Sequence, residues 1–239
     1  MTRSTSIVVS FLAIAISIDA TAASNKPFYV IAHMTNTTQS VRWAMQEGAN
    51  ALEMDLRFTA SGEPESFRHG GNIICDCICS AGESNHVCRL PSMSCEASTS
   101  VGNMFKALLA EPKLALVILD TKMTGAVSTA IQEKAGRRIV ERLQSDLFAK
   151  GYKGKVIVSG GHRDIMSYIR SAATRAMTMT SPFGSRMFFS FDQEGGSSVD
   201  AGCTIQTLTR LPSKNRAFGT GISACGSGHF EAAISTAAA

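Results

Sequence analysis

The stretch 51–58, ALEMDLRF, constrains this chain more than any other feature of its sequence. As a β-strand, whose side chains alternate between two faces, it places Glu53 and Asp55 on one face and apolar residues on the other. Two neighbouring carboxylates repel each other, and an unpaired buried charge is costly unless its pKa shifts. The pair therefore predicts half of a metal site, and the rest of the chain must supply the other half.

The N-terminus has the composition of a leader. Residues 1–23 carry one early positive charge, Arg3, then an apolar run from 7 to 18, and end in small residues. The run is shorter than the ~20 residues that a membrane-spanning helix needs, which favours a signal peptide and a secreted protein. Residues 24–239 are then enough for one large domain. The net charge of +4 is mild and scattered, so no nucleic-acid partner is expected, and we expect a monomer.

The remainder alternates between strand-like and helix-like segments. Short apolar runs predict strands at 28–32, 51–58, 114–119, 156–159 and 187–191, with a weaker one at 217–222. Helical spacing predicts helices at 38–47, 101–109, 127–149 and 163–173, and an Ala-rich helical start at the C-terminus. Between 59 and 98 no period is visible, which predicts a long loop. This alternation is typical of a parallel sheet covered by helices.

Two α/β architectures fit, an open doubly wound sheet and a (β/α)₈ TIM barrel. No glycine-rich phosphate-binding motif opens the first helix, so the usual argument for a nucleotide-binding open sheet is missing. Polar residues instead follow successive strands: His33 after the first, the acidic pair late in the second, and Asp120 with Lys122 after the third. A barrel gathers such residues at one mouth. Singly, each has an ordinary structural explanation, and their convergence favours a site.

Cysteine usage agrees with secretion. Of seven cysteines, five lie between 75 and 95. In a secreted chain this predicts a disulfide-linked loop, and a zinc site built from Cys75, Cys77, Cys79 and Cys88 is the alternative. The C-x-C-x-C spacing lacks the two-residue gap of common zinc knuckles, which favours disulfides. The odd number leaves at least one cysteine free or bonded between chains.

Several motifs in order resemble one family. IAHMTN at 31–36, GANALEMD at 48–55, HG at 69–70 before CDC at 75–77, and LDTK at 119–122 look like the arachnid sphingomyelinase D toxins, the dermonecrotic phospholipases D. The resemblance implies a glycerophosphodiesterase-like barrel with one Mg²⁺ held by Glu53, Asp55 and Asp120. It further implies His33 and His69 as the catalytic pair and Lys122 near the substrate phosphate.

The same resemblance implies a chemistry. Mg²⁺ takes hard oxygen ligands and phosphate oxygens, and histidines can move protons near neutral pH. The implied substrate is sphingomyelin or a lysophospholipid at a membrane surface. Its own hydroxyl attacks the phosphorus, the head group leaves and a cyclic phosphate forms. The family's second disulfide would match Cys77 with Cys225, whereas Cys75 could pair with Cys79 or Cys88.

Two departures from the family limit this expectation. Around 217–221 the family has a Trp for the choline group, and this chain has AFGTG, so Phe218 is the expected, weaker aromatic platform. The chain also stops at Ala239, where the family continues through a final strand, which predicts a barrel incomplete at its C-terminus. We expect the Asn36 glycosylation sequon to be unmodified. The alternative functions are a glycerophosphodiester phosphodiesterase and a non-catalytic lipid-binding relic.

Overall fold

The computed structural model describes residues 28–69, 98–179, 182–193 and 198–220. Three expectations fall on other residues: the signal peptide at 1–23, the helical start at the C-terminus, and the disulfides of the cysteines at 75, 77, 79, 88 and 225. Those expectations lie outside the described residues. Cys203 is described, and it is free and exposed.

The strands of the described residues form one eight-stranded sheet. Its parallel strands follow one another in chain order, each bonded to the next. They are β1 (Ile31–Ala32), β2 (Ala51–Phe58), β5 (Leu116–Thr121), β6 (Lys155–Gly160), β7 (Met187–Gln193) and β8 (Arg216–Thr220). Two antiparallel strands, β3 (Pro64–Phe67) and β4 (Thr99–Ser100), extend the sheet beside the end of β2.

This strand order decides between the two candidate architectures. A doubly wound sheet reverses its order at a switch point, whereas a barrel adds parallel strands in sequence. The described parallel strands show no reversal, and the sheet that they form is open. The α/β class and the parallel sheet are confirmed, in the arrangement of an incomplete barrel.

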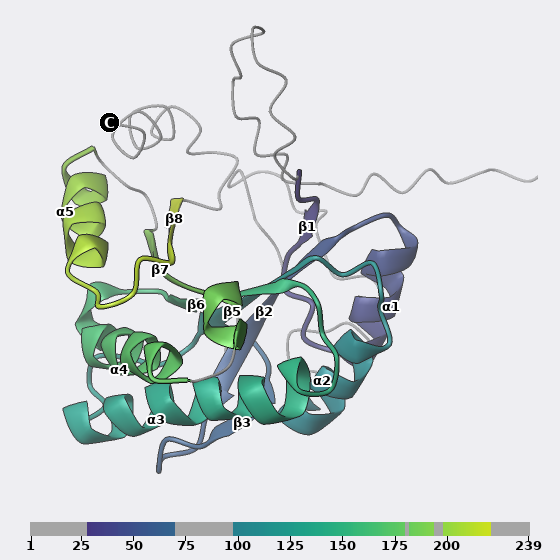
Figure 1. The fold of residues 1–239 in the computed structure, drawn as a ribbon, viewed down its shortest axis with the longest axis horizontal. Coiled ribbons are helices and arrows are strands. Elements are labelled where there is room, and N and C mark those ends of the chain that lie inside the picture. Colours follow the sequence, from purple (N-terminus) through teal and green to yellow (C-terminus); the bar gives the residue numbers. More distant parts are fainter. Residues whose placement is uncertain (1–27, 70–97, 180–181, 194–197, 221–239) are drawn as a thin grey trace, which may run out of the picture.

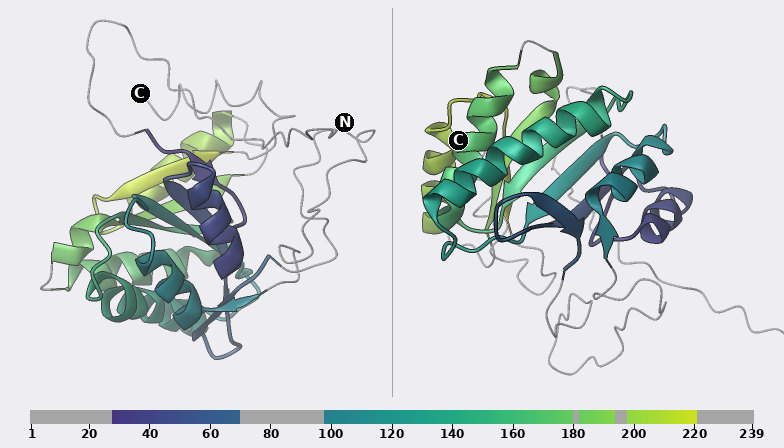
Figure 2. Two further views of the ribbon diagram at one scale, coloured as in Figure 1. Left: turned by 90° about the vertical axis from the view of Figure 1, so that its right-hand side faces the viewer. Right: turned by 90° about the horizontal axis from the view of Figure 1, so that it is seen from below.

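The helices lie on one side of this sheet (Figures 1 and 2). This is the result of right-handed crossovers between parallel strands that advance in one direction. The helices are α1 (Thr38–Gln46), α2 (Val101–Leu109), α3 (Thr129–Arg142), α4 (Met166–Met177) and α5 (Ser198–Thr209). Shorter turns are a π-helical segment, Leu143–Phe148, and the 3₁₀ segments Arg163–Ile165 and Pro182–Arg186.

Local chemistry sets the helix that precedes the central strand. Thr37 caps α1: its hydroxyl accepts from the Ser40 N–H at 3.0 Å, and the Ser40 hydroxyl accepts from the Thr37 N–H at 3.1 Å. Gly48 follows the helix with a φ of +96°, a backbone conformation that favours glycine. The chain therefore turns sharply from α1 into β2. The sequence predicted this arrangement, with a helix at 38–47 that ends before Gly48.

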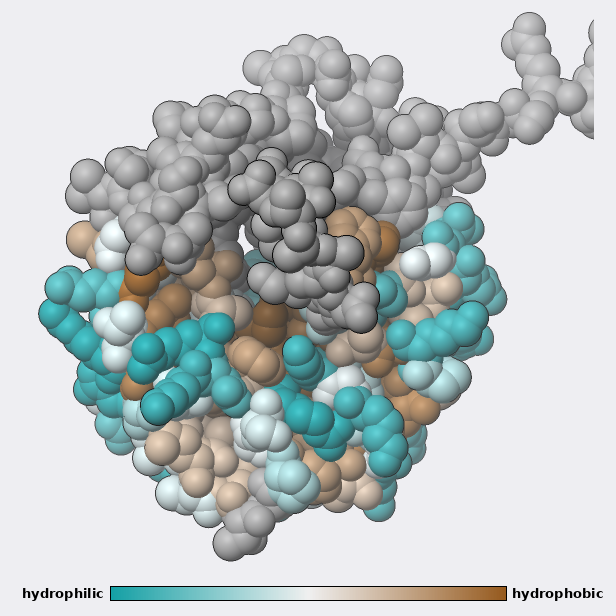
Figure 3. Space-filling model, turned by 45° about the horizontal axis from the view of Figure 1, so that its top comes forward, coloured by the Kyte–Doolittle hydropathy of each residue, from teal (hydrophilic) through white to brown (hydrophobic). Residues whose placement is uncertain are grey.

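The two faces of the sheet differ in burial. On the helix side, Val117, Leu119, Val158 and Phe189 are fully buried in one continuous core. On the other side, the apolar residues Ile118 and Ile157 are only partly buried, whereas the polar residues Asp55, Ser159 and Ser190 are buried. Figure 3, in which the top of the molecule is turned forward, shows apolar surface near the middle of the view between hydrophilic areas.

Several predicted boundaries are wrong. The strand expected at 28–32 is reduced to β1, and Phe28 is 60% exposed. The loop expected at 59–98 contains β3, which is stabilised by pairing with β2 rather than by its own sequence pattern. The strand expected at 114–119 is shifted toward the C-terminus by its register with β2.

The helices also differ in detail from the sequence predictions. The helix expected at 127–149 is divided into α3 and the π-helical segment, and α4 continues to Met177, beyond the expected end at 173. The helix α5 has little amphipathic pattern in its sequence and was not predicted. Among the described residues, no helix is both long enough and apolar enough to cross a membrane.

Candidate functional site

Three carboxylates meet where β2 and β5 lie side by side. The register pairs Asp55 directly with Asp120, so both side chains leave the same face of the sheet. Glu53 precedes Asp55 by two residues and shares that face. The three side chains each offer an oxygen, and these oxygens lie within 4.8 Å of one another. We call Glu53, Asp55 and Asp120 the acidic cluster.

The loop that follows β1 holds the first of these carboxylates. The Met34 N–H donates to Glu53 Oε2 at 2.7 Å, and the Thr35 N–H and hydroxyl both donate to the Glu53 carbonyl, at 2.9 and 2.8 Å. Met34 takes a left-handed φ of +58°, the only such non-glycine residue in the described ranges. A left-handed backbone is unfavourable for a residue with a Cβ, which makes this turn a strained one beside the site.

His33 lies at the start of the same loop, where the sequence placed it. Its Nε2 is 3.4 Å from Glu53 Oε2, and its side chain is 36% exposed, so the imidazole has one side toward the acidic cluster and one toward solvent. An imidazole in that position can exchange protons with a molecule bound at the cluster.

Asn36 clamps the second carboxylate. Its Nδ2 donates to Asp55 Oδ2 at 2.5 Å, and its Oδ1 accepts from the Asp55 N–H at 2.8 Å. Both residues are buried. A side chain that satisfies the backbone and the carboxylate of the same residue fixes the rotamer of that carboxylate, which is how outer residues orient metal ligands. In the sequence, Asn36 stood out only as part of the IAHMTN motif and as a sequon, and not as a residue that orients a carboxylate.

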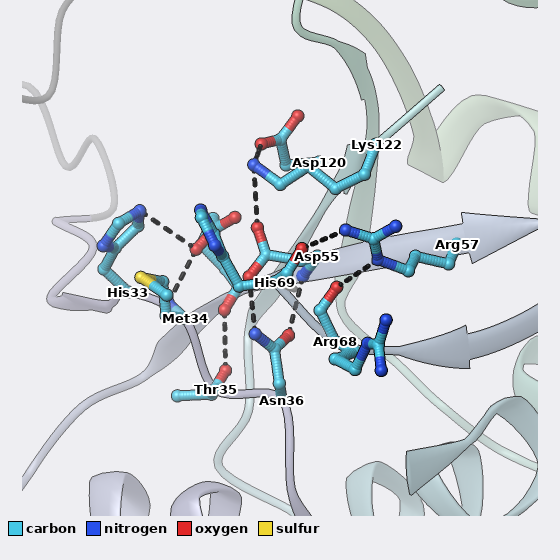
Figure 4. Close-up of polar contacts among 11 residues, drawn as sticks. His33, Met34, Thr35, Asn36, Asp55, Arg57, Arg68, His69, Asp120 and Lys122 are labelled. Atoms are coloured by element: carbon cyan, nitrogen blue, oxygen red, sulfur yellow. Dashed lines mark hydrogen bonds and ion pairs between the residues drawn. The ribbon is translucent and has the colours of Figure 1, made fainter. Parts of the chain in front are cut away.

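Lys122 balances the charge of the cluster. Its Nζ lies 2.9 Å from Asp55 Oδ1 and 2.5 Å from Asp120 Oδ2 (Figure 4). Desolvation lowers the pKa of this amine, but the Asp120 and Asp55 carboxylates outweigh it and raise the pKa above the ordinary value of a lysine. Lys122 therefore stays protonated at neutral pH and supplies one positive charge against three carboxyl groups.

The negative charge that Lys122 does not balance acts on the protonation of Glu53. Burial raises the pKa of Glu53 well above its ordinary value, and repulsion from Asp55 and Asp120 raises it further. The Met34 N–H and Lys122 lower this pKa, but by less. The buried Asp120 Oδ1 has no hydrogen-bond partner among the described residues. Three oxygen donors with surplus negative charge and an unsatisfied lone pair fit a hard divalent cation such as Mg²⁺.

His69 enters the site from β3. The Arg68 N–H donates to the Asp55 carbonyl at 2.9 Å, which places His69 directly after a residue bonded to the cluster strand. Arg57 donates from Nε to the Arg68 carbonyl at 3.0 Å and from Nη2 to the His69 carbonyl. Figure 4 shows these residues around Asp55. Arg57 was not singled out from the sequence, because a lone arginine at a strand end has no distinctive pattern.

Among the predicted site residues that the structure describes, Phe218 is the one that the sheet places elsewhere. In the register it aligns with Phe191, which is fully buried on the helix side, and Phe218 packs against the core. Asp120 pairs with Ser159, Ser159 with Ser190, and Ser190 with Ala217. Ala217 is therefore the residue of β8 that lies in register with the acidic cluster. The structure thus brings together His33, His69, Lys122 and the acidic cluster, but not Phe218.

Comparison with known proteins gives a consistent family. The family model described as dermonecrotic toxin SPH matches residues 23–229. Dermonecrotic toxins LiSicTox-betaIA1i of Loxosceles intermedia and LlSicTox-betaIA1 of Loxosceles laeta are each 32% identical over 133 residues. Those residues are 56% of this chain and 41% of either toxin, so the chain spans less than half the length of these relatives.

A solved structure is also similar. It is an Oleispira antarctica phosphodiesterase in complex with the product sn-glycerol-3-phosphate, with a TM-score of 0.47 and 11% identity, over 84% of this chain and 88% of that one.

Proposed function

We propose that this chain, which belongs to the dermonecrotic toxin SPH family, is a secreted, Mg²⁺-dependent phospholipase D of the sphingomyelinase D type. It would cleave the head group from sphingomyelin or lysophospholipids by attack of the lipid's own hydroxyl on phosphorus, which leaves a cyclic phosphate. The observation that carries the proposal is the acidic cluster, with its oxygens within 4.8 Å of one another and Lys122 and His33 in contact with it.

The side chains divide the work of such a reaction. Glu53, Asp55 and Asp120 would hold the cation, which when bound neutralises charge on the phosphoryl oxygens. Lys122 extends the positive charge to a phosphate that approaches the cluster. His33 and His69 would take the proton from the attacking hydroxyl and give one to the leaving head group.

Other parts of the proposal follow from the sequence. The leader at 1–23 and the cysteine-rich stretch support secretion and disulfide formation. The proposed lipid substrates imply action at a membrane surface, and we propose that the chain acts as a monomer. Choline recognition by Phe218 is not supported, because this side chain packs on the helix side of the sheet.

A substrate panel tests the function. The full chain is incubated with vesicles of sphingomyelin, with lysophosphatidylcholine and with soluble glycerophosphocholine, each with Mg²⁺ or with a chelator. Choline release and the phosphorus NMR signal of a cyclic phosphate are measured. We expect chelator-sensitive choline release and a cyclic product from the lipids.

The matched variants are His33→Ala, which should abolish turnover, and Arg42→Ala, which should not. Arg42 is exposed on α1, and among the described residues it has no ion-pair partner. Hydrolysis of glycerophosphocholine alone would instead assign a glycerophosphodiester phosphodiesterase. Lipid binding that survives His33→Ala, with no turnover of any substrate by the unmutated chain, would assign a non-catalytic lipid-binding protein.

A further inference from the structure

Arg57 lies on the cluster strand and on the face that carries the carboxylates. Glu53, Asp55 and Arg57 are separated by two residues each along β2, so their side chains leave the same side of the sheet. The Arg57 side chain is partly buried, and no carboxylate pairs with it among the described residues. A surface ion pair is therefore not what holds this arginine in place.

The guanidinium instead binds two consecutive backbone carbonyls. Nε donates to the Arg68 carbonyl at 3.0 Å, and Nη2 donates to the His69 carbonyl. The paired register between β2 and β3 starts at Leu56 and Phe67, so both acceptors lie beyond the strand ladder. Because the guanidinium is planar with donors in a fixed fork, two bonds to neighbouring carbonyls fix the course of the chain at His69.

We propose that Arg57 is a positioning residue that holds the backbone of His69 against the acidic cluster. The inference rests on the proposed function, in which His69 moves a proton, and it adds a residue that contacts neither substrate nor cation. Arg57 is on the same strand as two cluster residues, so one rigid element positions the carboxylates and the backbone of His69. Small displacements of a proton-transfer group reduce the rate strongly, and a shift of ~1 Å can lower it about 100-fold.

Three variants separate positioning from charge. Arg57→Ala removes both bonds, Arg57→Lys keeps the charge but cannot donate in a fixed fork, and Arg57→Gln keeps one neutral donor. Arg137→Ala is the matched control, since Arg137 is exposed on α3 and has no partner among the described residues. Steady-state turnover of lysophosphatidylcholine and amide hydrogen exchange at Arg68 are measured for each variant, with and without guanidinium chloride at millimolar concentration.

We expect kcat to fall about 100-fold in Arg57→Ala and Arg57→Lys with KM nearly unchanged, and free guanidinium to restore part of it in Arg57→Ala. Exchange at Arg68 should rise in both variants but not in Arg137→Ala. Full activity in Arg57→Lys, or a rise in KM with kcat unchanged, would overturn the inference. If the unmutated chain turns over no substrate, the proposed function fails, and unchanged exchange at Arg68 would separately refute the positioning by Arg57.

Discussion

Replacing Lys122 by Met removes the only lysine or arginine charge in contact with the acidic cluster in the described part of the chain. The substitution keeps an unbranched side chain, one heavy atom shorter than that of lysine, and removes the ion pairs to Asp55 and Asp120. Asp55 is 1% exposed and Asp120 14% exposed. Breaking a buried ion pair by removing one partner destabilises a protein by about 3–5 kcal/mol. Since 27% of the Lys122 side chain is exposed, we expect about 3 kcal/mol, the lower end.

Urea unfolding of the parent and of Lys122→Met, each with a chelator and with Mg²⁺, measures this loss. A ligand at 100 times its dissociation constant stabilises the native state by about 2.7 kcal/mol. Mg²⁺ should stabilise Lys122→Met more than the parent, because without Lys122 the cluster has more uncompensated negative charge. The stabilisation by Mg²⁺ in Lys122→Met minus the stabilisation by Mg²⁺ in the parent is the coupling free energy between the Lys122 amine and the cation.

Two results would refute this reasoning. A loss below about 0.5 kcal/mol in the chelator, the range of ordinary surface substitutions, would mean that the carboxylates do not depend on Lys122. An equal loss with and without Mg²⁺ would mean that the cation binds elsewhere or not at all.

Two further predictions concern the acidic cluster, and a third concerns the contact between α3 and α4. Asn36→Ala leaves the buried carboxylate and N–H of Asp55 without their partner, which should cost about 2–3 kcal/mol in urea unfolding and at least about 10-fold in Mg²⁺ affinity by calorimetry. Glu53→Gln should make the chelated protein more stable than the parent at pH 7. The pKa of Glu53 is higher in the folded parent than its ordinary value of 4.5, so the parent loses stability as pH rises from 4.5 through the folded pKa. Below pH 4.5 the carboxyl group is protonated in both the folded and the unfolded parent, and the stability advantage of Glu53→Gln should vanish. Gly136→Ala places a Cβ 2.3 Å from the Tyr168 carbonyl, so α3 must move away from α4. We expect a fall of about 2 kcal/mol in the free energy of unfolding, measured with urea. An unchanged urea midpoint would show that the two helices separate freely.

The acidic cluster could be predicted from sequence because its signal is local. Glu53 and Asp55 are two residues apart in a clear strand, and Asp120 with Lys122 follows the most apolar run of the chain. Parallel strands bring such positions to one edge whatever their exact boundaries. The strand predicted at 114–119 was shifted by its register, yet Asp120 still reached Asp55.

The residues that orient the cluster could not be predicted, because their roles depend on pairing between distant segments. Asn36 is 19 residues from Asp55, and the bond between them needs the turn at Met34. Phe218 was assigned to the wrong side because the face of a short strand is set by its register with β7, and not by the letters AFGT. A strand of five residues carries too little alternation to show which face is buried.

The pairing of Asp55 with Asp120 across β2 and β5 also bears on how long the folded chain persists. The two carboxylates, and Glu53 beside them, come together only when these strands have found their register. A divalent cation held by all three would bind the finished structure and not the transition state that leads to it. Such a ligand slows unfolding and leaves the rate of folding nearly unchanged. The lifetime of the folded chain would then depend on the divalent cation concentration of the surrounding solution.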